Sequence, residues 1–248
     1  MRVTLLGTGY AIPTAERVHT SLLVETNENL LLFDCGSGVL HRIAESGYDT
    51  ARISAIFFTH HHLDHDSDFL SLMKANWLKG RNDMRIYGPE GTKDWLTHLL
   101  GAYPYLQGRL ALDVEEVMNG GEVRLGKDVV SYRTSAHGFL GLAYKVSSAG
   151  SSMVYSGDTE PCDAVAQLSK GAGLLVHECN VLVGEADGHS TPLTLGKLLE
   201  GIELEKLVLV HLPPEIESPE IKTKVLQSLS GYFKGEIIIG SDLLRLEL

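Results

Sequence analysis

The sequence predicts one domain of α+β structure, residues 1–248, in which β-sheets carry helices on their outer faces. Two observations predict this fold class. Short apolar segments alternate with amphipathic ones along the 248 residues, without a linker or a low-complexity stretch. Strands come first as a pair and only later alternate with helices, which favours sheets covered by helices. The 44% apolar and 21% charged residues are ordinary for a globular chain and exclude disorder, collagen and coiled coil.

The predicted strands share β-branched or aromatic side chains and Gly, Asn or Asp at their ends. They are residues 3–6, 21–25, 30–33, 53–58, 84–87, 129–134, 142–146, 152–155, 174–177, 207–210 and 236–239. Strands 142–146 and 152–155 are expected to form a hairpin. Residues 212–248 are expected to hold one helix and a terminal hairpin.

Three predicted helices carry start signals. Asp66 or Ser67 is expected to cap the first, whose apolar stripe covers residues 69–77. The second and third each begin at a hydroxyl residue followed by proline, namely Thr191 and Ser218. Proline suits the first helical position because its missing N–H has no partner there in any case.

Composition narrows the class of protein. Lys and Arg total 21 against 32 Asp and Glu, a net charge of −11, so the chain is a poor generic binder of polyanions. Its apolar runs are too short to span a membrane or to act as a signal segment, so we expect a cytoplasmic protein without membrane contact. The three cysteines have no paired spacing, which argues against a disulfide framework. Whether the chain forms a homodimer stays open.

The strongest motif is His60-x-His62-x-Asp64-His65, directly after the predicted strand 53–58. Imidazole nitrogen and carboxylate oxygen are donors that zinc, iron and manganese accept. His60 and His62 are expected to point the same way because side chains alternate in extended backbone. Asp64 and His65 then follow in the turn and can face a second ion. A solvated histidine-rich loop is the alternative interpretation.

Three further strands deliver a metal-competent residue at their C-terminal ends, namely His137, Asp158 and His211. Any one alone would more often be a capping or a hydrogen-bonded residue, but four such strand ends in one chain favour a metal site. Seven ligands fit two ions: His60, His62 and His137 for one, Asp64, His65 and His211 for the other, with Asp158 bridging. Two Zn²⁺ ions suit this donor set, with Mn²⁺ or iron as alternatives.

These ligands, together with Gly7-Thr8-Gly9 and the segment from Leu32 to Gly36, resemble the metallo-β-lactamase superfamily. The resemblance runs from residue 3 to about residue 212. It implies a four-layer αββα sandwich of two mixed β-sheets flanked by helices, with a dimetal site at one edge. It also implies that Asp34 accepts a hydrogen bond from a ligand histidine and orients it, a support that metal-bound imidazoles generally need.

Two further segments, His177-Glu178-Cys179 and Gly188-His189-Ser190-Thr191, resemble motifs of the RNase Z branch. The resemblance implies a phosphodiesterase in which a metal-bridging hydroxide, steered by Asp64, attacks phosphorus. His189, oriented by Glu178, then protonates the leaving oxygen as general acid. The alternative is that His189 and Ser190 merely cap the helix that follows.

The sequence departs from that branch in one respect. Only residues 138–157 separate His137 from Asp158, which leaves no room for a long tRNA-binding arm. We therefore expect a small phosphodiester or an unstructured RNA as substrate. A lactonase, an arylsulfatase-like enzyme or a thioester hydrolase of the same superfamily is the alternative function. A non-catalytic binding module is a further one.

Overall fold

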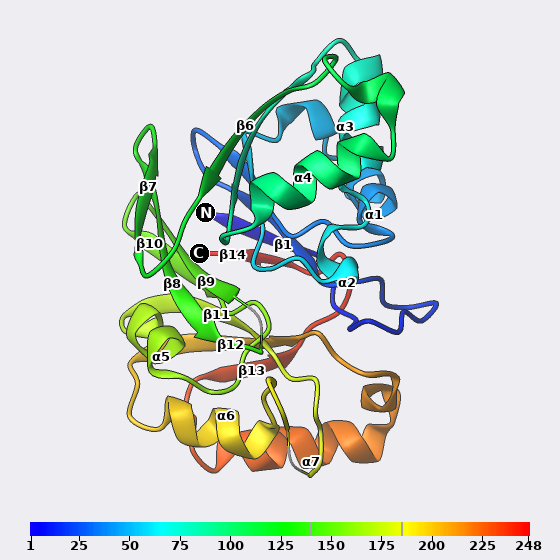
Figure 1. Ribbon diagram of the computed structural model, residues 1–248. Coiled ribbons are helices and arrows are strands. Elements are labelled where there is room, and N and C mark those ends of the chain that lie inside the picture. The colour runs from blue at the N-terminus through cyan, green and yellow to red at the C-terminus, as the bar shows by residue number, and fades with distance from the viewer. Residues whose placement is uncertain (139, 185) are drawn as a thin grey trace.

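The computed structural model describes residues 1–138, 140–184 and 186–248, and the chain forms four layers (Figure 1). Two seven-stranded sheets pack face to face, and helices cover the outer face of each. The αββα sandwich predicted for this chain is confirmed. Within the described residues, no helix combines the length and the apolar character needed to cross a membrane.

The first sheet holds the N-terminal strands and one strand from the C-terminus. Its spatial order is β14 (Arg245–Glu247), β1 (Arg2–Gly7), β2 (Ser21–Glu25), β3 (Leu30–Phe33), β4 (Ala55–Phe57), β5 (Asp83–Gly88) and β6 (Ala111–Glu116). The strands from β3 to β6 run parallel, whereas the pairs on the other side are antiparallel. Apolar side chains of α1 (Val39–Glu45), α3 (Phe69–Leu78) and α4 (Thr92–Gly101) pack on its outer face. The short helix α2 (Leu63–Asp66) lies beyond the end of β4.

The second sheet follows the same scheme. Its order is β13 (Glu236–Ile239), β12 (Leu204–Val210), β11 (Ala172–Glu178), β10 (Ser151–Tyr155), β9 (Leu140–Ser148), β8 (Asp128–Ala136) and β7 (Gly121–Leu125). The strands from β10 to β13 run parallel, and the others are antiparallel. Its outer face is covered by α5 (Asp163–Ser169), α6 (Pro192–Leu199) and α7 (Pro219–Ser230). Short 3₁₀ helices occur at η1 (Thr50–Arg52), η2 (Pro104–Leu106) and η3 (Pro214–Glu217).

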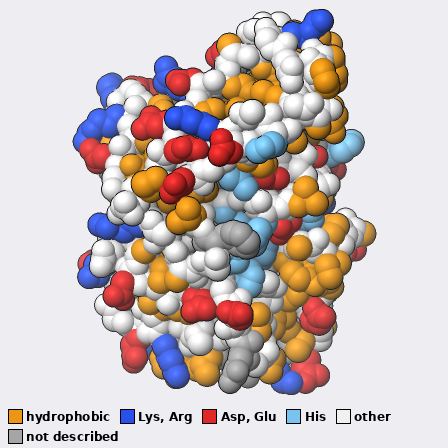
Figure 2. Space-filling view, in the orientation of Figure 1, with side chains coloured by type: hydrophobic (Ala, Val, Ile, Leu, Met, Phe, Trp, Pro, Cys, Tyr) orange, Lys and Arg blue, Asp and Glu red, His pale blue; other side chains and the backbone are white. Residues whose placement is uncertain are grey.

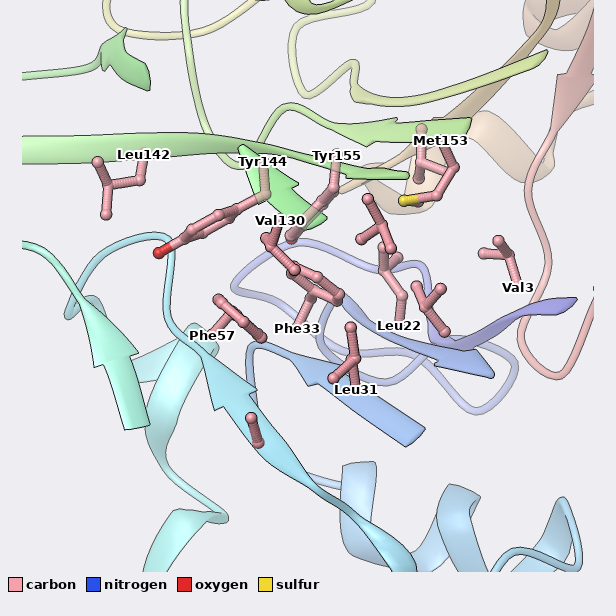
Figure 3. Close-up of a cluster of buried hydrophobic side chains, with 14 of the residues drawn as sticks. Val3, Leu22, Leu31, Phe33, Phe57, Val130, Leu142, Tyr144, Met153 and Tyr155 are labelled. Carbon is pink, nitrogen blue, oxygen red and sulfur yellow. The ribbon is translucent and has the colours of Figure 1, made fainter. Parts of the chain in front are cut away.

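An aromatic ladder between the sheets aligns the strand ends that lead into the site. Phe33, Phe57 and Tyr87 are register neighbours on β3, β4 and β5, and their rings stack at 5.0 and 4.8 Å. Tyr144 of β9 reaches across from the second sheet and contacts Phe33 and Phe57 (Figure 3). Because the three strands are parallel and in register, the segments that follow them emerge at one edge of the sandwich.

The helix that begins after Thr191 is confirmed as α6. The Thr191 side chain accepts a hydrogen bond from the backbone N–H of Thr194, and the Thr194 hydroxyl accepts one in return, which forms a capping box. The cap expected at Asp66 or Ser67 is wrong, because residues 63–66 form the separate helix α2 and α3 begins after Asp68.

The terminal hairpin expected within residues 212–248 is also wrong. β13 pairs with β12 in the second sheet, whereas β14 pairs with β1 in the first, so the C-terminal segment connects the two sheets. The hairpin expected between residues 142–146 and 152–155 is confirmed by the pairing of β9 with β10.

Candidate metal centre

The seven predicted ligands lie together at the edge of the sandwich where strands of both sheets end. Their origins are the segment after β4 for His60 and His62, α2 for Asp64 and His65, and the ends of β8, β10 and β12 for His137, Asp158 and His211. Figure 2 shows histidine side chains gathered at the middle of one face of the molecule. Residues far apart in the chain therefore meet in one place, as the spacing of the motifs predicts.

The carboxylate of Asp158 lies at the centre of this cluster. Its Oδ2 is 3.2 Å from Nε2 of His211, 3.4 Å from Nε2 of His65 and 3.8 Å from Nε2 of His60. One oxygen atom thus faces imidazoles from both sheets. This is the position expected of a residue shared by two sites.

The donor atoms fall into groups that match the predicted division. One group holds His60, His62, His137 and Asp158, and another holds Asp64, His65 and His211, with all donor atoms of a group within 4.8 Å of one another. A third group combines Asp158 and His211 with His189. His189 therefore stands close enough to the cluster to act on the same bound molecule.

The chemistry of these donors fits divalent cations. Nε2 of His60, Nε2 of His65 and Oδ1 of Asp158 are buried, and none finds a hydrogen-bond partner among the described residues. Burial lowers the pKa of His60 well below its usual value and the pKa of His211 to about 4, although Asp158 acts to raise both. Both rings are then neutral, which is the form that binds a metal.

His65 indicates where positive charge is required. Its Nε2 lies 3.4 Å from Asp158 Oδ2 and 3.6 Å from Asp64 Oδ2, while its Nδ1 is 2.8 Å from Asp34 Oδ2. Asp34 is satisfied by its own hydrogen-bond donors, but when His65 is neutral the charges of Asp158 and Asp64 beside its Nε2 are left unbalanced, and burying an unpaired charge is costly. A bound cation would supply the missing charge.

Asp34 supports the cluster from the side away from its centre. Its fully buried carboxylate accepts hydrogen bonds from the backbone N–H and the hydroxyl of Thr59, from Nδ1 of His65 and from the hydroxyl of Tyr155, all at 2.8–2.9 Å. The contact with His65 is the one that the family resemblance implies. With Nδ1 of His65 donating to Asp34, its Nε2 lone pair points towards the cluster.

Thr59 fixes the orientation and the tautomer of the His60 ring in a similar way. Its hydroxyl donates to Asp34 and therefore accepts from Nδ1 of His60, which lies 3.0 Å away. That arrangement places the proton of His60 on Nδ1 and leaves the Nε2 lone pair free. On the opposite side of the cluster, Nδ1 of His137 donates to the backbone carbonyl of Gly188 at 2.8 Å.

The backbone is held in unusual conformations at two of these residues. Asp34 and His211 have φ values of 57° and 55°, in the left-handed region that few residues other than glycine adopt. Gly36 lies so close to the motif that a Cβ there would sit 1.9 Å from the carbonyl oxygen of Asp64. The turn after β3 therefore requires glycine at position 36, since any larger residue would displace α2.

Glu178 and His189 form a second polar unit beside the cluster. Oε1 of Glu178 lies 3.1 Å from Nδ1 of His189 and accepts hydrogen bonds from the backbone N–H groups of Thr159 and Ser190, while Oε2 accepts from Asn180 N–H. Burial raises the pKa of Glu178 to about 7, against the opposing effect of His189. Burial acts to lower the pKa of His189, but the hydrogen bond and negative charge of Glu178, together with the charge of Asp158, raise it overall.

Sequence reasoning missed several residues that hold the site. Thr59 and Tyr155 lie beside predicted ligands, but nothing in their local pattern indicates that both contact Asp34. His19, in the loop before β2, is buried. Its Nδ1 accepts from Ser37 N–H at 3.1 Å and its Nε2 faces the carbonyl of Ala11 at 3.3 Å. Such bonds depend on the tertiary structure, so a local motif cannot predict them.

Comparison with known proteins gives consistent relationships. Residues 1–230 match the protein family described as Anti-Pycsar protein Apyc1. A ribonuclease Z of Mycobacterium sp. (strain KMS) is 32% identical over 278 aligned positions, which cover 100% of this chain and 96% of the relative. The metallo-β-lactamase fold protein YhfI of Bacillus subtilis superposes with a TM-score of 0.83 at 22% identity, covering 99% of this chain and 98% of its own. The short form of human tRNase Z superposes with a TM-score of 0.82 at 22% identity, covering 100% of this chain and 99% of that chain.

Replacing Asp34 tests how much the site depends on one carboxylate. In chelator-treated protein, Asp34→Asn should lower the free energy of unfolding by about 3 kcal/mol, because a charged acceptor is lost and buried donors are left unpaired. Tyr155→Phe removes only one of the four hydrogen bonds and should cost about 1 kcal/mol. Urea denaturation measures both values. Equal losses for the two variants would contradict a central role for the carboxylate.

Proposed function

The chain belongs to the protein family described as Anti-Pycsar protein Apyc1, with a metallo-β-lactamase fold, and from this membership we propose that it is a phosphodiesterase that uses two divalent metal ions. The observation that carries the proposal is the convergence of seven donor side chains at one edge, with the Glu178–His189 pair beside them. The ribonuclease Z relatives support a hydrolase that cleaves phosphodiesters.

The donor groups indicate which residues would hold each ion. His60, His62 and His137 would hold one, Asp64, His65 and His211 the other, and Asp158 would be shared. When bound, such ions neutralise phosphoryl oxygens and lower the pKa of a bound water to about 7. An imidazole-rich set with carboxylates suits Zn²⁺, with Mn²⁺ or iron as alternatives. Asp64, which is less buried than Asp158, would also orient the attacking water.

His189 is the proposed general acid. With Nδ1 bonded to Glu178, its other ring nitrogen is directed to the donor cluster, and a raised pKa favours the protonated ring that an acid requires. Glu178 would orient the ring and stabilise its charge. The competing interpretation, that His189 and Ser190 cap the next helix, is not supported, because Thr191 is the capping residue and the Ser190 hydroxyl donates to Thr159.

Three observations support a small or unstructured substrate. The interval between His137 and Asp158 is largely taken up by β9 and β10, which are joined by the short turn at Ala149 and Gly150. The alignment with the mycobacterial ribonuclease Z spans 278 positions, whereas this chain has 248 residues, so that relative carries insertions. The net charge of −11 also disfavours many phosphate contacts with a large RNA.

The first prediction concerns metal content. Zinc-supplemented protein should contain two ions per chain by elemental analysis and should hydrolyse bis-p-nitrophenyl phosphate. Asp158→Ala should lose most of the metal and of the activity, since the shared carboxylate contacts donors of both groups. Asp113→Ala, an exposed carboxylate on β6, is the matched control and should retain both. One ion or none in the supplemented wild type would exclude the two-metal site.

The second prediction separates acid catalysis from metal binding. His189→Ala should keep wild-type metal content but lower turnover of a methyl phosphodiester by about 10²–10⁴-fold, the usual contribution of a general acid. Turnover of a p-nitrophenyl diester should fall much less, because this leaving group needs little protonation. Glu178→Gln should show the same pattern more weakly, and His98→Ala, an exposed histidine of α4, should show none. Equal losses on both leaving groups would argue against the acid role.

The third prediction concerns substrate size. The metal-loaded protein should cleave small phosphodiesters or unstructured RNA and process the 3′ end of precursor tRNA poorly. Gel analysis of a precursor tRNA and of an unstructured oligonucleotide, at equal enzyme concentration, compares the two. Efficient processing of the precursor tRNA without a partner protein would show that this substrate assignment is wrong.

A further inference from the structure

A pocket lies away from the metal centre, on the outer face of the second sheet. It has a volume of about 450 Å³, and its lining comes from the turn before β7, from β7, β8 and β9, and from the last turn of α5. Figure 1 shows α5 beside β8, and this helix of seven residues leaves part of the sheet uncovered. None of the described lining residues belongs to the donor cluster or to the Glu178–His189 pair.

The register of the strands places three polar side chains on this outer face. Val130 and Tyr132 of β8 pack with the core between the two sheets. Because side chains alternate along a strand, Ser131 and Arg133 point to the opposite face. Lys145 of β9 is the register partner of Ser131 and therefore shares its face. A guanidinium, an ammonium and a hydroxyl group thus line one pocket.

Neither cation of this pocket is neutralised by a carboxylate. Arg133 forms no hydrogen bond or ion pair with any residue that the structure describes. The ammonium of Lys145 donates to the backbone carbonyl of Lys170 at 3.2 Å, and it too forms no ion pair within the described residues. Burial lowers the pKa of Lys145, so its charged form would gain from a counter-ion. In a chain with a net charge of −11, both cations are therefore available to an external anion.

The other groups of the lining suit the same kind of ligand. The carboxylate of Glu122 lines the pocket, but it already accepts a hydrogen bond from the guanidinium of Arg124. The Ser131 hydroxyl and the Gln167 amide make no hydrogen bond in the described part of the chain, so each can donate to a ligand. Leu168 of α5 adds apolar surface. Cations beside neutral donors are typical surroundings of a phosphate group.

We propose that this pocket, which we name the Arg133 pocket, binds a small phosphate dianion, either free or as a phosphomonoester. Arg133 offers a planar fork of donors and Lys145 a point charge, while Ser131 and Gln167 donate to the remaining oxygens. Such a phosphate carries a charge of about −1.5 to −2 at pH 7, which matches two cations. The volume leaves room for an organic group beside Leu168. The inference does not depend on the phosphodiesterase function proposed above.

Nuclear magnetic resonance of the zinc-loaded protein, after removal of free zinc, tests this site with inorganic phosphate and phenyl phosphate as probes. Each probe should shift the backbone amide signals of Ser131 and Gln167 in a saturable way. Arg133→Gln and Lys145→Gln should each weaken this binding by about tenfold, the usual loss for a hydrogen bond to a charged group. Tighter binding of phenyl phosphate would identify the ligand as a phosphomonoester, and equal affinity would identify it as free phosphate.

Two further variants separate the pocket from general effects. Lys170→Gln removes the same charge nearby but outside the lining, and it should leave the affinity for both probes unchanged. Glu122→Gln removes the negative charge of the lining and should tighten binding by about two- to fivefold. Damage to the fold would weaken binding, so this gain has the opposite sign to a structural defect.

The metal centre would also attract phosphate, so the two sites must be told apart. Chelator-treated wild type should keep the response of the Ser131 and Gln167 signals, because the Arg133 pocket contains no donor of the cluster. Loss of the response in that sample would assign it to the metal centre and overturn the proposal. Absence of a saturable shift in the wild type, or wild-type affinity in Arg133→Gln, would overturn it as well. A failure to hydrolyse phosphodiesters would leave these results unaffected.

Discussion

The hydrogen bonding of one buried carboxylate, Asp34, organises the edge of the sandwich. Its partners come from the segment after β4, from α2 and from β10, so a single side chain fixes elements of both sheets relative to one another. A buried charge is tolerated only when it is fully hydrogen-bonded, and four donors meet that condition here. The positive φ of Asp34 indicates that the backbone accepts strain to place this carboxylate correctly.

The strand arrangement explains why the functional groups gather where they do. β3, β4 and β5 are parallel in one sheet, and β10, β11 and β12 are parallel in the other, so each sheet presents several carboxyl ends at the same edge. Ligand sites in sheets with parallel strands commonly form beyond such ends. The aromatic stack of Phe33, Phe57 and Tyr87 keeps three of these ends in register. The core therefore determines the position of the site.

Much of this arrangement could be predicted from local patterns, and the remainder depends on tertiary contacts. The histidine motif is compact and the strand ends at His137, Asp158 and His211 are clear, so their convergence followed from the fold class. β6 and β7 were not predicted because they alternate exposed charged residues with few apolar ones, as suits strands at sheet edges. The partners of Asp34 lie 25–121 residues away in the chain, beyond the reach of any local pattern.

The division of donors between the sheets has a consequence for how the two proposed ions influence each other. Each of the two donor groups proposed to hold an ion takes residues from the first sheet and at least one from the second. A small sliding of one sheet over the other would distort both groups at once, whereas occupancy of either group would resist that sliding. Binding of the first ion would hold the sheets in the alignment that the second donor group also needs. The second ion would then bind with a smaller loss of conformational entropy, so the two ions should bind with positive cooperativity. The sandwich interface would transmit that coupling in addition to the shared carboxylate of Asp158.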